Sequence, residues 1–92
     1  MGKENLSPER IKAIRTLDVE YAMEFAHKNG TPFRAARSEI TGAHMTAEQI
    51  ALMSLHQMRF SLGTKAERRA SEKWLLSRGL PRFTGDPKIY GH

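Results

Sequence analysis

Three basic residues in the last third of the chain stand four positions apart, namely Lys65, Arg69 and Lys73. On a helix, this spacing places the three side chains along one side. Cations arranged in this way contact the phosphates of nucleic acid, and such binding weakens steeply with salt because it releases counterions. Arg68 lies beside this row, and Arg78 continues the positive region. The pattern predicts a surface for nucleic acid or for an acidic face of another protein.

The charge of the whole chain is concentrated in the same region. Residues 63–92 contain seven Lys or Arg and three acidic residues, whereas residues 1–62 contain eight and seven, so +4 of the net charge of +5 lies in the last third. Glu67 and Glu72 lie among these cations and would repel phosphate. A solvated surface that keeps a small protein in solution explains the same composition, so both interpretations stay open. The predicted binding residues are Lys65, Arg68, Arg69, Lys73, Arg78, Arg82 and Lys88.

Other kinds of chemistry have little support in the sequence. The chain has no cysteine, and its four histidines lack the spacing of metal ligands. Paired carboxylates and a glycine-rich phosphate loop are also missing. We therefore expect a protein that is not an enzyme and that uses no metal and no cofactor. His56 stands on a mostly apolar segment, which favours a histidine that makes one hydrogen bond at the edge of the core.

The first element expected to support this surface is an N-terminal helix over residues 8–29. Ser7 is a good N-cap, and Pro8 suits the first helical position. Apolar residues then recur at three- and four-residue steps. The run is interrupted around Leu17, where Asp18 would cap a second helix. The sequence leaves open whether residues 8–29 form one helix or two.

Two helices are expected in the middle of the chain. Thr31 is followed by a proline, which repeats the first helix start and predicts a short helix over residues 32–40. Thr46 and Gln49 form a capping box at the start of a helix over residues 47–61. That helix is apolar around most of its circumference, which is typical of a central element.

The last predicted helix carries the basic residues. Thr64 and Glu67 form a second capping box, and Gly79 with Leu80 is typical of a Schellman motif at the end. The inner face of this helix is expected to contain Ala66, Ala70 and Trp74, with Leu75 alongside. Gly63 forms the turn before the helix, in an arrangement like that of a helix-turn-helix, although the spacing of small and apolar residues does not match that motif.

The fold class is therefore predicted to be all-α, a compact single-domain bundle of four to five short helices with an irregular C-terminal tail. Residues 1–6 are expected to form a flexible N-terminus, residues 7–80 the helical domain, and residues 81–92 the irregular basic and aromatic tail. The sequence contains no stretch of about 20 apolar residues. We expect a cytoplasmic protein with no membrane contact, of the kind that small prokaryotic, plasmid or phage accessory proteins represent.

Three hypotheses for function follow. The first is a non-enzymatic regulatory module that binds DNA or RNA through the basic C-terminal helix and tail. The alternative is an inhibitor or adaptor that docks on an acidic surface of a larger protein complex, using Arg82 and the aromatic residues Trp74, Phe83 and Tyr90. The third is a homodimer that buries the apolar surplus of the segment 45–62.

Overall fold

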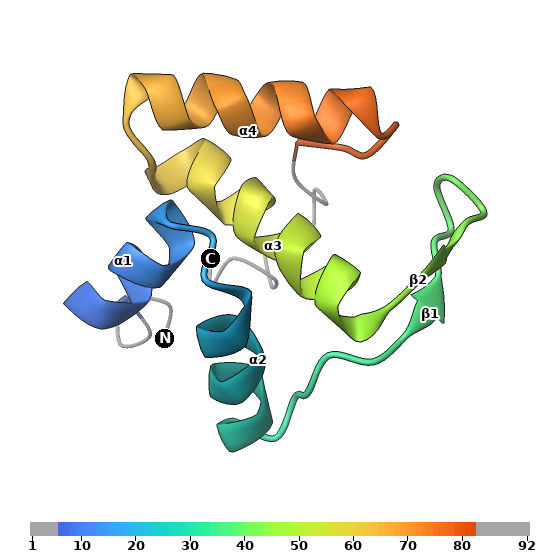
Figure 1. The fold of residues 1–92 in the computed structure, drawn as a ribbon, viewed down its shortest axis with the longest axis horizontal. Helices are drawn as coiled ribbons and strands as arrows, with labels where there is room; N and C mark the ends of the chain where they lie inside the picture. Colours follow the sequence, from blue (N-terminus) through green and yellow to red (C-terminus); the bar gives the residue numbers. More distant parts are fainter. Residues whose placement is uncertain (1–5, 83–92) are drawn as a thin grey trace.

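The computed structural model describes residues 6–82, and residues 1–5 and 83–92 lie outside this part. The predictions for the N-terminal residues and for most of the tail, including Phe83, Lys88 and Tyr90, therefore fall outside the described residues. The described chain forms four helices and one short β-hairpin, so it is mostly helical, as predicted (Figure 1). The elements are α1 (Pro8–Arg15), α2 (Val19–Lys28), β1 (Ala36–Arg37), β2 (His44–Met45), α3 (Ala47–Leu62) and α4 (Lys65–Ser77).

The N-terminal segment forms two helices. Ser7 caps α1 by accepting a hydrogen bond from the backbone N–H of Arg10 at 3.2 Å. Asp18 caps α2 in the same way, through its contact with the N–H of Tyr21 at 3.0 Å. Between the two caps, Leu17 has a φ of 56°, in the left-handed region that L-residues rarely adopt. The local polar side chain of Asp18 and this backbone reversal therefore end one helix and begin the next.

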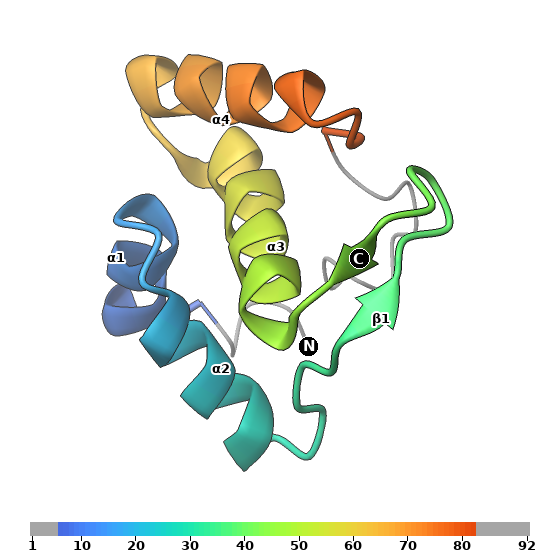
Figure 2. The ribbon, with the colours of Figure 1, turned by 45° about the vertical axis from the view of Figure 1, so that its right-hand side comes forward.

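Helix α3 is the central element, as its apolar surface predicted. It contacts α1, α2, α4 and β2, and Figures 1 and 2 both show it crossing the middle of the molecule. The predicted capping box between Thr46 and Gln49 is present, with both of its hydrogen bonds formed. Ala51 and Leu55 on this helix are fully buried. Other helices supply the remaining buried apolar side chains, and Leu80 follows α4. These are Ala13, Ile14, Ala26, Leu75 and Leu80.

The predicted helix over residues 32–40 is wrong. This part of the chain contains β1, which pairs antiparallel with β2 in the register Ala36 with Met45 and Arg37 with His44. The hydroxyl of Ser38 accepts hydrogen bonds from the backbone N–H groups of two residues in the connecting loop, Ile40 and Thr41. A serine that satisfies nearby backbone donors stabilises a turn at the expense of a helix. The cap-then-proline pattern at Thr31 did not reveal this local competition.

The corner between α3 and α4 requires a glycine. A Cβ atom on Gly63 would lie 2.8 Å from the backbone oxygen of Arg59 and 2.8 Å from the Cβ of Glu67, which is closer than real contacts of this kind. The predicted capping box between Thr64 and Glu67 is formed. The two helices therefore meet at a tightly packed corner that fixes where α4 points.

The inner face of α4 matches the prediction at Leu75 and differs from it at the alanines. Ala66 and Ala70 are exposed, and the buried residues of the helix are Ser71 and Leu75. The prediction followed the apolar residues, whereas the helix buries a serine because that serine has polar partners beneath it.

The C-terminal end of α4 is formed as predicted. Gly79 has a positive φ of 68°, and its N–H contacts the carbonyl of Leu76. The N–H of Leu80 reaches the carbonyl of Leu75 at 2.9 Å, which completes a Schellman motif. Gln57 of α3 donates to the carbonyl of Pro81 at 3.2 Å and holds the chain that follows. The segment that follows α4 is therefore held to the central helix α3 by this hydrogen bond.

Candidate functional site

The solvent side of α4 carries the predicted row of cations. Lys65, Arg69 and Lys73 are exposed, and none of them forms an ion pair within residues 6–82. The small side chains of Ala66 and Ala70 lie beside them on the same side of the helix. We call these five residues the outer face. Because it combines free charges with small side chains, a rigid anionic surface could approach the helix backbone closely there.

The two acidic residues of α4 are both paired with arginines. Glu67 lies 3.0 Å from the Nε of Arg15, and Glu72 lies 2.8 Å from the guanidinium of Arg82. The hydrogen bond from Arg15 and the one from the backbone of Thr64 hold the pKa of Glu67 below its ordinary value. These ion pairs offset much of the repulsion that the acids would exert on a phosphate. They also mean that Arg82 is engaged within the chain.

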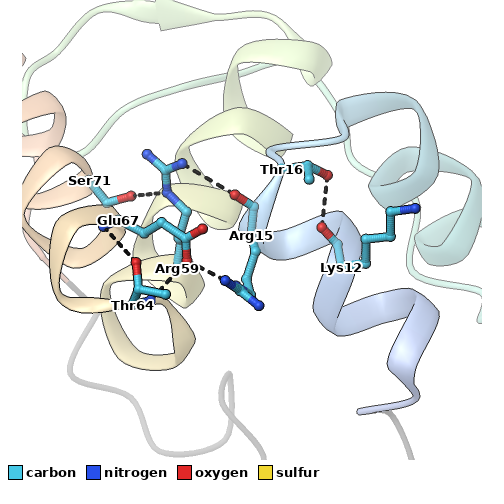
Figure 3. A network of polar contacts seen from close by, with 7 residues as sticks. All are labelled: Lys12, Arg15, Thr16, Arg59, Thr64, Glu67 and Ser71. Carbon is cyan, nitrogen blue, oxygen red and sulfur yellow. Dashed lines mark hydrogen bonds and ion pairs between the residues drawn. The ribbon is translucent and has the colours of Figure 1, made fainter.

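Arg59 lies near the outer face in sequence but is directed into the molecule. Its Nε donates to the hydroxyl of Ser71 at 2.7 Å, and its guanidinium also donates to the backbone carbonyl of Arg15 at 3.3 Å (Figure 3). Together with the Arg15–Glu67 pair, these contacts join the end of α1 to α3 and α4. Arg59 therefore has a structural role and does not extend the outer face.

A stack of two aromatic rings, one of them buried, lies under the other side of α4. The ring of His56 packs on the ring of Trp74 with centroids 4.0 Å apart and planes inclined by 13°. The Nδ1 of His56 lies 3.1 Å from the hydroxyl of Ser71, which also accepts from Arg59. His56 is 3% exposed, and burial together with the charges of Arg59 and Arg78 lowers its pKa to about 4.

The hydrogen bond predicted for His56 is therefore confirmed. The Ser71 hydroxyl has one proton and two lone pairs, so it can donate to Nδ1 of a neutral His56 while its oxygen accepts from Arg59.

Arg78 belongs to this stack and is separated from the outer face. Arg78 is the C-cap residue of α4, and its guanidinium lies 4.1 Å from the centroid of the Trp74 ring, four residues earlier. At 100° per residue, Trp74 and Arg78 follow a different line along α4 from that of Lys65, Arg69 and Lys73. A four-residue step between a tryptophan and an arginine is visible in the sequence and could have revealed this contact.

The remaining predicted site residues are Arg68, on α4, and three residues of the tail. Arg68 is exposed and forms no ion pair among the described residues. Lys88, Phe83 and Tyr90 lie outside residues 6–82, so their positions relative to α4 are not described. The predicted binding residues between positions 6 and 82 therefore fall into three kinds. Arg82 is paired with Glu72, and Arg78 is stacked on Trp74. The others form no ion pair among the described residues, namely Lys65, Arg68, Arg69 and Lys73.

Metal sites and membrane-spanning helices have no candidate in the part of the chain that the structure describes. No group of three His, Asp or Glu residues between positions 6 and 82 could hold a metal ion. Among the helices of the same segment, none has the length and apolar character needed to span a bilayer. Comparison of the chain with protein-family models, with curated proteins and with solved structures finds no match. The residues themselves are therefore the basis for a functional assignment.

Proposed function

We propose that the protein is a non-enzymatic module that binds nucleic acid through the outer face of α4. Lys65, Arg69 and Lys73 contact successive phosphates, and Arg68 adds charge at the side. Most of the affinity comes from phosphate contacts, so binding depends steeply on salt and only weakly on base sequence.

The observation that carries this proposal is the unequal pairing of charges on one helix. Both acids of α4 are held by arginines, Glu67 by Arg15 and Glu72 by Arg82, whereas the three cations of the outer face have no ion pair within residues 6–82. Solubility alone does not require the acids of α4 to be paired and its cations to be unpaired, since a surface of mixed charges also keeps a protein in solution. The exposed alanines support a close approach of the helix to its ligand.

The test is the fluorescence anisotropy of labelled duplex DNA, single-stranded DNA and RNA titrated with the protein at about 50 and about 200 mM salt. The key variant changes Lys65, Arg69 and Lys73 together to Glu. We expect the affinity of the preferred nucleic acid to fall by at least roughly 100-fold, because favourable phosphate contacts become repulsive. Helical content and melting temperature should remain close to those of the unchanged protein, since all three side chains are exposed.

A matched control separates local charge from net charge. Changing Lys12, Lys28 and Arg34 to Glu produces the same change in net charge at exposed positions on other parts of the molecule. This control should retain most of the affinity. Equal losses in the two triple variants would mean that only the total charge matters, and full binding by the α4 variant would contradict the proposal.

The second candidate is an adaptor that docks on an acidic protein surface. The observation that favours it is Leu76, which is 57% exposed on α4 near the cations, because an exposed leucine beside basic residues suits a protein interface better than a phosphate backbone. Failure to bind any of the three nucleic acids even at low salt would favour this candidate. The homodimer hypothesis also stays a prediction, because α3 contacts α1, α2 and α4 but keeps Leu52 and Met53 partly exposed and Leu62 exposed.

A further inference from the structure

A pocket of about 360 Å³ lies between the hairpin, the first half of α3 and the end of α4. Its volume falls within the range of small-molecule sites. Figure 1 shows the hairpin loop and the end of α4 on the same side of α3. The side chains that form most of its wall are apolar, namely Ala43, Met45, Leu52, Trp74 and Leu80. The pocket can therefore accept an apolar group.

The charge of the pocket is positive. Arg78 lines it, and none of the lining residues between positions 6 and 82 is acidic. The guanidinium of Arg78 is held over the Trp74 ring, and its one hydrogen bond among the described residues is a long contact of 3.4 Å to the hydroxyl of Ser77. Stacking restricts the position of the guanidinium while leaving its N–H groups able to donate. The pocket thus contains a cation that is already oriented and has no acidic partner within residues 6–82.

We propose that this pocket binds a small monocarboxylic acid with an apolar body. The apolar part of the ligand lies against Leu52, Leu80 and the edge of Trp74. The carboxylate accepts hydrogen bonds from Arg78, whose planar group suits two parallel bonds to a carboxylate. Gln49 also lines the pocket and can supply an amide donor or acceptor to the polar end of the ligand.

This site is independent of the nucleic-acid surface. Trp74 and Arg78 lie on a line of α4 separate from that of Lys65, Arg69 and Lys73, and the pocket is lined by none of those three. An anion such as phosphate would use only the polar lining residues Thr41, His44, Gln49 and Arg78 and would leave the apolar wall unused. A carboxylate joined to an apolar body uses both parts of the wall, which is why we choose this class of ligand.

The experiment titrates the full chain with octanoate, octan-1-ol and octylammonium, which share one apolar body and differ in the charge of the head group. Trp74 is the single tryptophan of the chain and lines the pocket, so its fluorescence reports occupancy directly. Amide chemical shifts of Met45 and Leu52 give a second readout. We expect saturable binding of octanoate, with octanol at least tenfold weaker and octylammonium weaker still.

Two variants test the role assigned to Arg78. In Arg78→Gln, octanoate should bind no more tightly than octanol, because the preference for the carboxylate is lost. In the matched control Arg69→Gln, which removes a charge from the outer face of the same helix, octanoate binding should be unchanged. The comparison of head groups on the unchanged protein needs no variant, so the proposal can be judged even if Arg78→Gln fails to fold.

Three results would overturn the proposal. The first is the absence of saturable octanoate binding to the full chain. The second is equal affinity of the unchanged protein for octanoate and octanol. The third is a set of shift changes that follows Lys65, Arg69 and Lys73 and leaves Met45 and Leu52 unaffected, because the carboxylate would then be held by the outer face. None of these results bears on nucleic-acid binding, which is measured separately.

Discussion

The two sides of α4 differ in whether their polar side chains have partners within the described part of the protein. On the inner side, Ser71 accepts from Arg59 and contacts His56, while Trp74 stacks with both His56 and Arg78. Within residues 6–82, no buried side-chain nitrogen or oxygen lacks a hydrogen-bond partner. On the outer side, three cations face solvent without an ion pair among the described residues. One helix thus has a fully partnered side and a free side.

This difference between the two sides follows from their unequal contact with water. A polar group removed from water loses free energy unless a protein partner replaces the lost hydrogen bonds, so the inner side of α4 must be complete. The outer side remains hydrated, and its cations can stay unpaired at little cost to stability. Inner residues are therefore constrained by the fold, whereas the outer cations are available for binding. Each prediction below changes one side and uses the other side, or a more exposed group, as its reference.

The largest effect is expected from two adjacent leucines. Leu75 is 0% exposed and Leu76 is 57% exposed. Leu75→Ala should lower the free energy of unfolding by about 2–5 kcal/mol, because it removes buried methyl groups and leaves a cavity. Leu76→Ala should change it by less than about 0.5 kcal/mol. Urea unfolding followed by circular dichroism measures both. Similar losses in the two variants would mean that the two sides of α4 are not distinct in packing.

An effect of intermediate size is expected from pH. In the folded protein the pKa of His56 is lowered to about 4, whereas in the unfolded chain it is close to its ordinary value of 6.5. The unfolded state therefore takes up a proton first as pH falls. The stability contribution of neutral His56 is complete above pH 6.5 and is lost progressively down to pH 4, by about 3 kcal/mol in total. Unfolding free energies measured across this interval check the prediction.

The reference variants for this measurement are two glutamine substitutions. His56→Gln removes the titrating group, so it should show a smaller loss between pH 6.5 and 4 even if it is less stable at neutral pH. His27→Gln, at an exposed position on α2, should follow the unchanged protein. A pH dependence that is the same in His56→Gln as in the unchanged protein would assign the acid sensitivity to other groups.

The smallest effect is expected from the ion pair that joins α1 to α4. A double-mutant cycle with Arg15→Gln and Glu67→Gln should give a coupling of about 0.2–1 kcal/mol, because both side chains are partly exposed. Glutamine at position 67 keeps an acceptor for the capping box. The more exposed pair of Lys28 and Glu24 provides the reference and should couple less. A coupling well above 1 kcal/mol would show that this contact belongs with the partnered inner side.

Local signals in the sequence predicted a large part of this architecture. The capping boxes at Thr46 and Thr64 act within four residues, so their hydrogen bonds are fixed by nearby chemistry and could be predicted. The Schellman end at Gly79 is another local device. The mostly helical fold and the central position of α3 follow from the same kind of pattern.

Two features escaped prediction, one set by local hydrogen bonds and one by contacts between distant residues. The hairpin of β1 and β2 spans few residues, and its turn depends on how Ser38 satisfies nearby backbone donors. The inner face of α4 was predicted to contain Ala66, Ala70 and Trp74, with Leu75 alongside. The buried Ser71 was missed, because its partners His56 and Arg59 come from the preceding helix. Sequence patterning cannot show that a polar residue will meet two complementary groups when the helices pack.

The candidate site was predicted in part for a similar reason. Lys65, Arg69 and Lys73 share one side of α4 because helical spacing requires it. The positions of Arg78 and Arg82 depend on aromatic and acidic neighbours, which decide whether an arginine is stacked, paired or free. A count of charges in the sequence does not distinguish these arginines. The packed structure shows that Arg78 is stacked and that Arg82 is paired.

The left-handed backbone at Leu17 has a consequence for the shape of the whole molecule. If residues 8–28 continued as one helix, that helix would be a rod about 31 Å long at a rise of about 1.5 Å per residue, nearly as long as the 33 Å longest dimension of the protein. A straight rod crosses a second helix at one place only. By reversing the chain at a single residue, the protein obtains two short arms, α1 and α2, that each contact α3. The left-handed torsion at Leu17 thus lets residues 8–28 contact the central helix α3 through two short helices instead of one long one.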